Sequence, residues 1–128
     1  MTQQTSFDWS SGELAEGLRC YCSEQFFLAH EHWESVWLKC REPEKAFLQS
    51  LIQTAAAFHH LQKQNNIGAA SLLQNALRKL EALPPSFGGI EVAPLRDEIR
   101  AWLQGLCGQN TPSQLPYPEI RKTPGPSA

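Results

Sequence analysis

The sequence has no long apolar run and no start typical of a secreted protein. A helix needs about 20 consecutive apolar residues to span a bilayer, and no stretch of this chain approaches that length. The first ten residues, MTQQTSFDWS, carry neither the basic start nor the apolar centre of a signal peptide. These absences predict a cytoplasmic protein without a membrane partner.

An excess of charge of either sign is also missing. The chain has 128 residues with 11 Lys and Arg against 13 Asp and Glu, so the formal net charge is −2. No block of like charge runs along it, whereas nucleic-acid binders usually present a basic face. We therefore expect no nucleic-acid partner, and a chain of this length has room for one domain.

Signatures of cofactor chemistry and nucleophilic catalysis are absent. The chain contains neither the GxxxxGK[ST] nor the GxGxxG phosphate-binding pattern, and it has no G-x-S-x-G elbow. Cys20 and Cys22 form C-x-C, which places the two thiols about 200° apart on a helix, and no C-x-x-C pair exists. Together with Cys40 and Cys107 they are interpreted as reduced, structural thiols. These patterns predict no cofactor.

The sequence does contain residues that start and end helices. Ser10 or Ser11 can cap a first helix, and further helices are predicted over about 25–40, 44–64 and 67–83, with a fifth that begins near Pro94. No segment alternates like a strand for more than four residues. The prediction is an all-α fold, a compact bundle of about five helices built from two antiparallel helical hairpins plus a C-terminal helix. Residues 10–107 would form this single domain.

The C-terminal tail has a different composition. Residues 108–128 hold five of the nine prolines and few apolar groups, so this tail is predicted to be disordered. The triplet Pro116-Tyr117-Pro118 resembles a docking peptide, but it lacks a spaced P-x-x-P framework.

The segment FFLAHEHWESVW carries the chemistry. At 3.6 residues per turn, His30 shares one stripe with an aromatic wall of Phe26, Trp33 and Trp37. The adjacent stripe carries Glu31 and Glu34 beside apolar residues. A buried carboxylate without a partner costs several kcal/mol, so these groups must be paired or used.

The third predicted helix offers a polar complement. Gln49, Gln53, Ala56 and His60 form a narrow stripe opposite a broad apolar face. This stripe is either a solvated face or a seam that faces the His30/Glu34 helix. Ala56 favours the seam, because an exposed helix face more often carries Lys or Glu at such a position. The candidate site is therefore a polar seam of His30, Glu31, Glu34, Gln49, Gln53 and His60.

Residues 18–83 resemble the small all-helical family known as domain of unknown function 309. The matching pieces are Ala29-His30-Glu31, Trp33-Glu34 and Trp37, then Leu51-Ile52-Gln53, Ala55-Ala56 and His59-His60, followed by Asn65, Gly68-Ala69 and Leu72-Leu73, with Gly89-Ile90 and Leu95 beyond. The resemblance implies a compact helical bundle and no particular activity.

The chain also departs from this family at four positions. The family commonly has glutamate where this chain has Leu28, which weakens a multi-carboxylate metal site. It often has glycine where this chain has Glu24, Ser50 and Gln64. The residues at 50 and 64 suggest that close backbone approach is less demanded here.

Three interpretations cover the same residues. The first is a metal-dependent enzyme or metal-binding protein, in which His30 and Glu34 at i, i+4 share one ion with His60 and Glu31 acts as a base. The segment reads H-E-x-x-E, however, and not the H-E-x-x-H of metalloproteases. The second is a purely structural core histidine, and the third is a groove that receives a peptide or helix.

We predict a small soluble helical domain that acts as a non-catalytic interaction or scaffold module. Its partner would be a protein or peptide that the sequence does not identify. Whether the chain is an enzyme stays open, and the metal-binding cluster is the alternative.

Overall fold

The computed structural model describes residues 7–108 and 115–124, and most of these residues are helical. Five helices account for the described fold, which confirms the all-α prediction. They are α1 (Gly12–Cys22), α2 (Phe26–Trp37), α3 (Glu44–Gln62), α4 (Asn66–Glu81) and α5 (Val92–Cys107).

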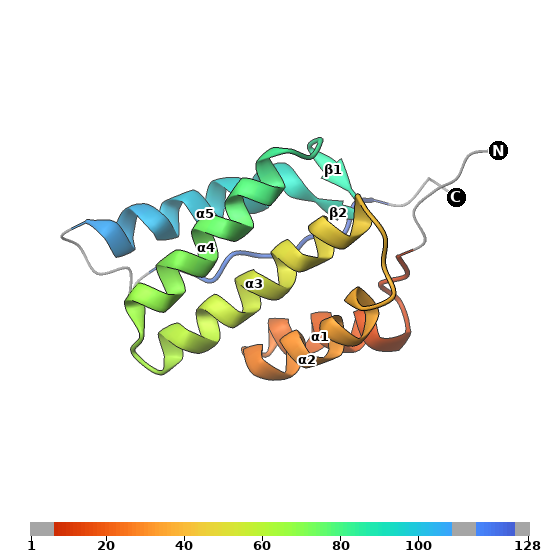
Figure 1. The fold of residues 1–128 in the computed structure, drawn as a ribbon, viewed down its shortest axis with the longest axis horizontal. Coiled ribbons are helices and arrows are strands. Elements are labelled where there is room, and N and C mark those ends of the chain that lie inside the picture. Colours follow the sequence, from red (N-terminus) through yellow and green to blue (C-terminus); the bar gives the residue numbers. More distant parts are fainter. Residues whose placement is uncertain (1–6, 109–114, 125–128) are drawn as a thin grey trace.

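The helices form two antiparallel hairpins with α5 added at one side. α1 packs on α2 and α3 packs on α4, while α2 joins the hairpins by packing on α3. α5 lies against α4. Figure 1 shows α3 in the middle, with α1 and α2 below it and α4 and α5 above it. The predicted arrangement of two hairpins plus a C-terminal helix is therefore confirmed.

A short β-hairpin connects α4 to α5. β1 (Ser86–Phe87) pairs antiparallel with β2 (Ile90–Glu91). The turn between them uses Gly88 and Gly89 at φ values of 60° and 82°, which glycine adopts without steric cost. The sequence predicted only a loop here, because strands of two residues are too short to show alternation.

The core lies between the two helical hairpins, continues to the inner side of α5, and is rich in aromatic rings. Its largest fully buried side chains are Trp33 and Phe26 of α2, and Phe47 and Phe58 of α3. Phe26 and Phe58 meet across the hairpins with ring centroids 5.7 Å apart. Burial of such side chains is worth about 1.5–3 kcal/mol each, so these rings hold α2 on α3.

Two turns place a residue other than glycine in the left-handed region. Glu24, between α1 and α2, has φ 63°, and Gln64, between α3 and α4, has φ 66°. These are two of the three positions where glycine was expected from the family resemblance. The third, Ser50, is fully buried in α3 and donates its hydroxyl to the Phe47 carbonyl. At 24 and 64, glycine therefore suits the backbone conformation of the turn.

We expect Gln64→Gly to stabilise the protein by about 0.5–1 kcal/mol. A left-handed residue other than glycine costs roughly 1–2 kcal/mol, and the greater freedom of glycine in the unfolded chain offsets part of that gain. Urea unfolding measures the difference. As a control, Gln74→Gly on the exposed side of α4 should destabilise the protein by about 1 kcal/mol. Destabilisation by Gln64→Gly would contradict the assignment of strain.

Residues 115–124 pack on the bundle, and we call them the C-terminal strap. The prediction of a disordered tail is wrong for this segment, while residues 109–114 and 125–128 lie outside the described residues. In Figure 1 the strap crosses the molecule between α3 and the upper pair of helices. Pro118 and Ile120 are buried in it.

Side chains of the bundle satisfy the carbonyl groups of the strap. Tyr21 of α1 donates its hydroxyl to the Pro118 carbonyl at 2.7 Å, and Trp102 of α5 donates its indole N–H to the Pro116 carbonyl at 2.8 Å. Proline has no backbone N–H, so such a segment needs few acceptors of its own. This pairing allows a proline-rich segment to be ordered without forming a helix or strand.

The ring of Tyr117 anchors the strap between these two carbonyls. It stacks on Trp102 at 5.7 Å and 4° between planes, and it meets Phe26 and Phe58 edge-on at 4.9 Å and 5.0 Å. At the far end, the Thr123 N–H donates to the Gly89 carbonyl. Lys122 pairs with Ile90 of the hairpin through an isolated antiparallel β-bridge of the backbone. The strap therefore contacts α1, α2, α3, α5 and the hairpin.

Within the ranges 7–108 and 115–124, every helix is too short or too polar to cross a membrane.

Candidate functional site

The predicted aromatic wall of α2 is mainly core. Phe26 and Trp33 are 1% and 0% exposed, and the Trp33 indole N–H donates to the Leu14 carbonyl of α1 at 3.2 Å. Trp37 is only half-buried, and the ammonium of Lys45 lies 4.5 Å from its ring centroid. Two of the three rings thus hold α2 in place and leave Trp37 at the edge.

His30 occupies the boundary between the core and the solvent. Its side chain is 24% exposed, and its Nε2 lies 4.0 Å from the Glu34 carboxylate one turn away. Its ring stacks against Phe27 with centroids 5.8 Å apart. Nδ1 is buried and has no hydrogen-bond partner among the described residues. His30 therefore lies at the edge of the core, with Nδ1 buried and Nε2 near the Glu34 carboxylate.

The other predicted members of the seam divide into two groups. Gln49, Gln53 and His60 are half-buried on α3, and the Gln53 Oε1 is buried without a described partner. Glu31 and Glu34 instead lie in solvent, on the exposed side of α2. The expectation that Glu34 enters a buried seam is wrong, and its exposure removes the need for a buried partner.

The proposed metal ligands do not converge. His60 contacts Asn65, with its Nδ1 3.2 Å from the amide nitrogen, in the turn after α3. Across residues 7–108 and 115–124, no group of three His, Cys, Asp or Glu side chains is placed to hold a metal ion. His30, Glu34 and His60 therefore lack the third convergent ligand that a zinc or iron site requires.

His32 was absent from the sequence interpretation and has a structural contact. Its Nδ1 lies 2.6 Å from the Glu13 carboxylate, which joins the start of α1 to the middle of α2. Nothing in the spacing of two residues 19 positions apart predicts this pair. His32 therefore completes the α1–α2 hairpin.

His59 lies beside the exposed start of α2. Its ring centroid is 5.2 Å from that of Phe27. Burial lowers the pKa of His59, and the neighbouring Lys63, His60 and His30 lower it further. The His59 imidazole is therefore mainly uncharged at neutral pH, which suits a ring packed against an apolar side chain.

The exposed side of α2 forms a continuous stripe, which we call the α2 outer face. Its apolar members are unusually exposed, at 49% for Phe27, 46% for Leu28 and 67% for Leu38. Glu31, Glu34 and Ser35 lie between these ends. The positions follow the period of a helix, so all six side chains point the same way over roughly 16 Å.

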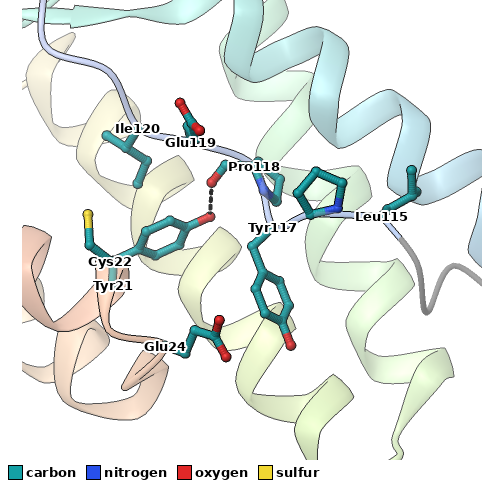
Figure 2. A pocket seen from close by; sticks show the side chains of 9 residues that line it. Tyr21, Cys22, Glu24, Leu115, Tyr117, Pro118, Glu119 and Ile120 are labelled. Atoms are coloured by element: carbon teal, nitrogen blue, oxygen red, sulfur yellow. Dashed lines mark hydrogen bonds between the residues drawn. The ribbon is translucent and has the colours of Figure 1, made fainter.

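A hollow of about 540 Å³ lies between the α1–α2 turn and the C-terminal strap. Figure 2 shows Tyr21 and Cys22 of α1 on one side of it, Tyr117 and Pro118 of the strap on the other, and Glu24 below. Burial raises the pKa of Tyr21 well above its ordinary value, and burial and Glu24 raise that of Tyr117. Both phenols are therefore neutral at physiological pH.

A relative from Aquifex aeolicus (strain VF5), described as an uncharacterized protein, is 28% identical over 122 residues. The alignment covers 91% of this chain and 32% of the relative, so the chain spans about a third of the relative's length. That description and the one of the matching family name no catalytic activity or metal. Residues 14–72, which contain α2, α3 and nearly all of α1, match the family described as Domain of unknown function (DUF309), which confirms the resemblance.

Proposed function

We propose that this chain is a non-catalytic interaction module that binds a protein partner through the α2 outer face. The observation that carries the proposal is the exposure of Phe27, Leu28 and Leu38 on one side of a single helix. Scattered single apolar residues are normal on a surface, but aligned ones that are about half exposed or more are typical of contact sites.

The inner side of α2 supports the same proposal. Phe26 and Trp33 fix the helix to its neighbours, so the outer face needs no rearrangement before it binds. Binding surfaces that are rigid beforehand lose less conformational entropy on association. The half-buried Gln49, Gln53 and His60 of α3 are proposed as a polar border of this surface.

The length of the relative is consistent with a module of this kind. The matching region makes up about a third of the Aquifex aeolicus protein. A helical domain inside a longer chain commonly packs against other segments through an exposed helix face.

Site-specific photo-crosslinking tests the proposal. We expect benzoylphenylalanine at position 27 or 38, introduced into the protein in its native cells, to give a discrete covalent adduct upon irradiation. Both positions lie on the α2 outer face. Mass spectrometry of the adduct identifies the partner peptide and the attached site.

A matched position on another helix provides the control. Ser71 is exposed on α4, so the same photoreactive residue there should give no discrete adduct. Equal adduct formation from positions 27, 38 and 71, or none from any of them, would contradict docking through the α2 outer face.

A further inference from the structure

The hollow beside the C-terminal strap has a negative rim. Glu24 lines it, and among the described side chains no Lys, Arg or His forms an ion pair with the Glu24 carboxylate. The second lining carboxylate, Glu119, is paired with Arg121 at 3.0 Å. Among the described residues that line the hollow, none has a basic side chain. Glu24 therefore supplies a carboxylate that is available to a cation.

The end of α1 adds negative potential at the same place. Cys22 is the last residue of α1, and the carbonyl end of a helix carries a partial negative charge. Arg19, the basic residue in the last turn, pairs with Glu16 on the exposed side of α1. The dipole of α1 and the Glu24 carboxylate thus act in the same direction on a group in the hollow.

The sides of the hollow are aromatic and apolar. Tyr21 and Tyr117 line it together with the rings of Pro116 and Pro118. Tyr21 is 4% exposed and its hydroxyl donates to the Pro118 carbonyl, so the half-buried Tyr117 ring is the aromatic surface that a ligand would meet. A planar guanidinium packs on such rings and forms hydrogen bonds with a carboxylate through its fork of N–H groups.

Glu24 is held in position by its backbone. Its N–H donates to the Tyr21 carbonyl at 3.0 Å, and its carbonyl accepts from the Gln62 side chain at 3.2 Å. The residue keeps this position although φ is 63°, which is costly for a side chain other than glycine. A charged side chain is thus retained at the rim of the hollow in a backbone conformation that glycine would adopt without strain.

We propose that this hollow binds the side chain of an arginine in a partner polypeptide, with its guanidinium against the Tyr117 ring and the Glu24 carboxylate. The volume of about 540 Å³ lies within the range of about 300–1,000 Å³ that ligand pockets occupy. The assignment of the arginine to a partner polypeptide rests on the proposed interaction function. The affinity of the hollow for a guanidinium does not depend on that function.

NMR titration of the full chain with N-acetyl-arginine amide tests this proposal. The blocked ends reproduce an arginine within a polypeptide, and the neutral N-acetyl-citrulline amide has nearly the same shape. We expect saturable shifts at residues 21, 24 and 117, with binding at least about tenfold weaker for the citrulline compound, because it lacks the charge. Equal binding of the two compounds would overturn the proposal.

Two variants locate the effect. Glu24→Gln should weaken binding of N-acetyl-arginine amide at least about tenfold, and this turn residue should leave the fold intact. Asp97→Asn removes an exposed carboxylate from α5, away from the hollow, and should leave the binding unchanged. Loss in both variants, or in neither, would contradict a specific site at Glu24.

Free arginine distinguishes the source of the ligand. Free arginine carries a charged α-ammonium and α-carboxylate where a residue within a polypeptide has neutral peptide groups, and bringing these charges to the hollow costs hydration, so we expect it to bind more weakly than the blocked compound. Tighter binding of free arginine would overturn a polypeptide as the source. Adducts from position 27 report on the α2 outer face alone, so either idea can fail while the other stands.

Discussion

Replacing Trp33 by alanine should lower the free energy of unfolding by about 3–5 kcal/mol. Trp33 is 0% exposed, and its indole contacts Tyr21 and Trp9 while donating to the Leu14 carbonyl. Truncation of a buried tryptophan creates a cavity and, here, also removes the indole hydrogen bond to that carbonyl. A loss of this size is a large fraction of the total stability of such a domain. Urea unfolding followed by far-UV circular dichroism measures it.

The comparison with Trp37 makes this prediction specific. Trp37 is half-buried at the end of α2, so Trp37→Ala should cost about 1–2 kcal/mol. Losses of equal size, or a loss below about 1 kcal/mol for Trp33→Ala, would contradict the assignment of Trp33 to the core.

We expect Tyr117→Ala to release the C-terminal strap and to cost about 2–4 kcal/mol. Its ring contacts Phe26, Phe58 and Trp102, which come from three different helices. Aromatic contacts of this kind add to the apolar area that is buried. Hydrogen exchange at residues 115–124 should rise together with the loss of stability measured by urea unfolding.

Two further variants separate the ring from the hydroxyl and from general effects on the strap. Tyr117→Phe keeps the ring and should change stability by less than about 0.5 kcal/mol. Leu115→Ala truncates a side chain that is 37% exposed and should have a similarly small effect. Fast exchange of the strap in the wild type would contradict its role in closing the bundle.

The helices could be predicted because their signals are local. The apolar stripes repeat every three to four residues, and the Pro84-Pro85 and Gly88-Gly89 pairs interrupt the pattern after α4. Observed ends differ from the predicted ones by a few residues, as at α2, which ends at Trp37 and not at Cys40. Fraying of the last turn leaves little trace in a sequence.

The strap could not be predicted because its partners are distant. Tyr117 stands between two prolines in a segment without helical or strand periodicity, and its contacts lie on α2, α3 and α5. The Tyr21 donor to Pro118 is 97 residues away in the sequence. Composition reports on what a segment can bury by itself and not on a surface that receives it.

The candidate site was predictable only where it depends on the local helical period. The period of α2 places His30 on the same stripe as the aromatic wall, and the His30 side chain is 24% exposed. The period does not say which edge meets α3, and so Glu34 was assigned to the buried seam although it lies in solvent. The hollow at Glu24 depends on the strap and had no signal in the sequence.

The effect of a substitution at position 28 on crosslinking from position 38 tests docking through the α2 outer face most directly. Leu28→Glu should leave the free energy of unfolding within about 0.5 kcal/mol, because Leu28 is 46% exposed. In a chain with the photoreactive residue at position 38, the same substitution should reduce adduct formation at least about fivefold, since a charge would enter the apolar contact. Undiminished adduct formation with an intact fold would contradict a partner bound along this face.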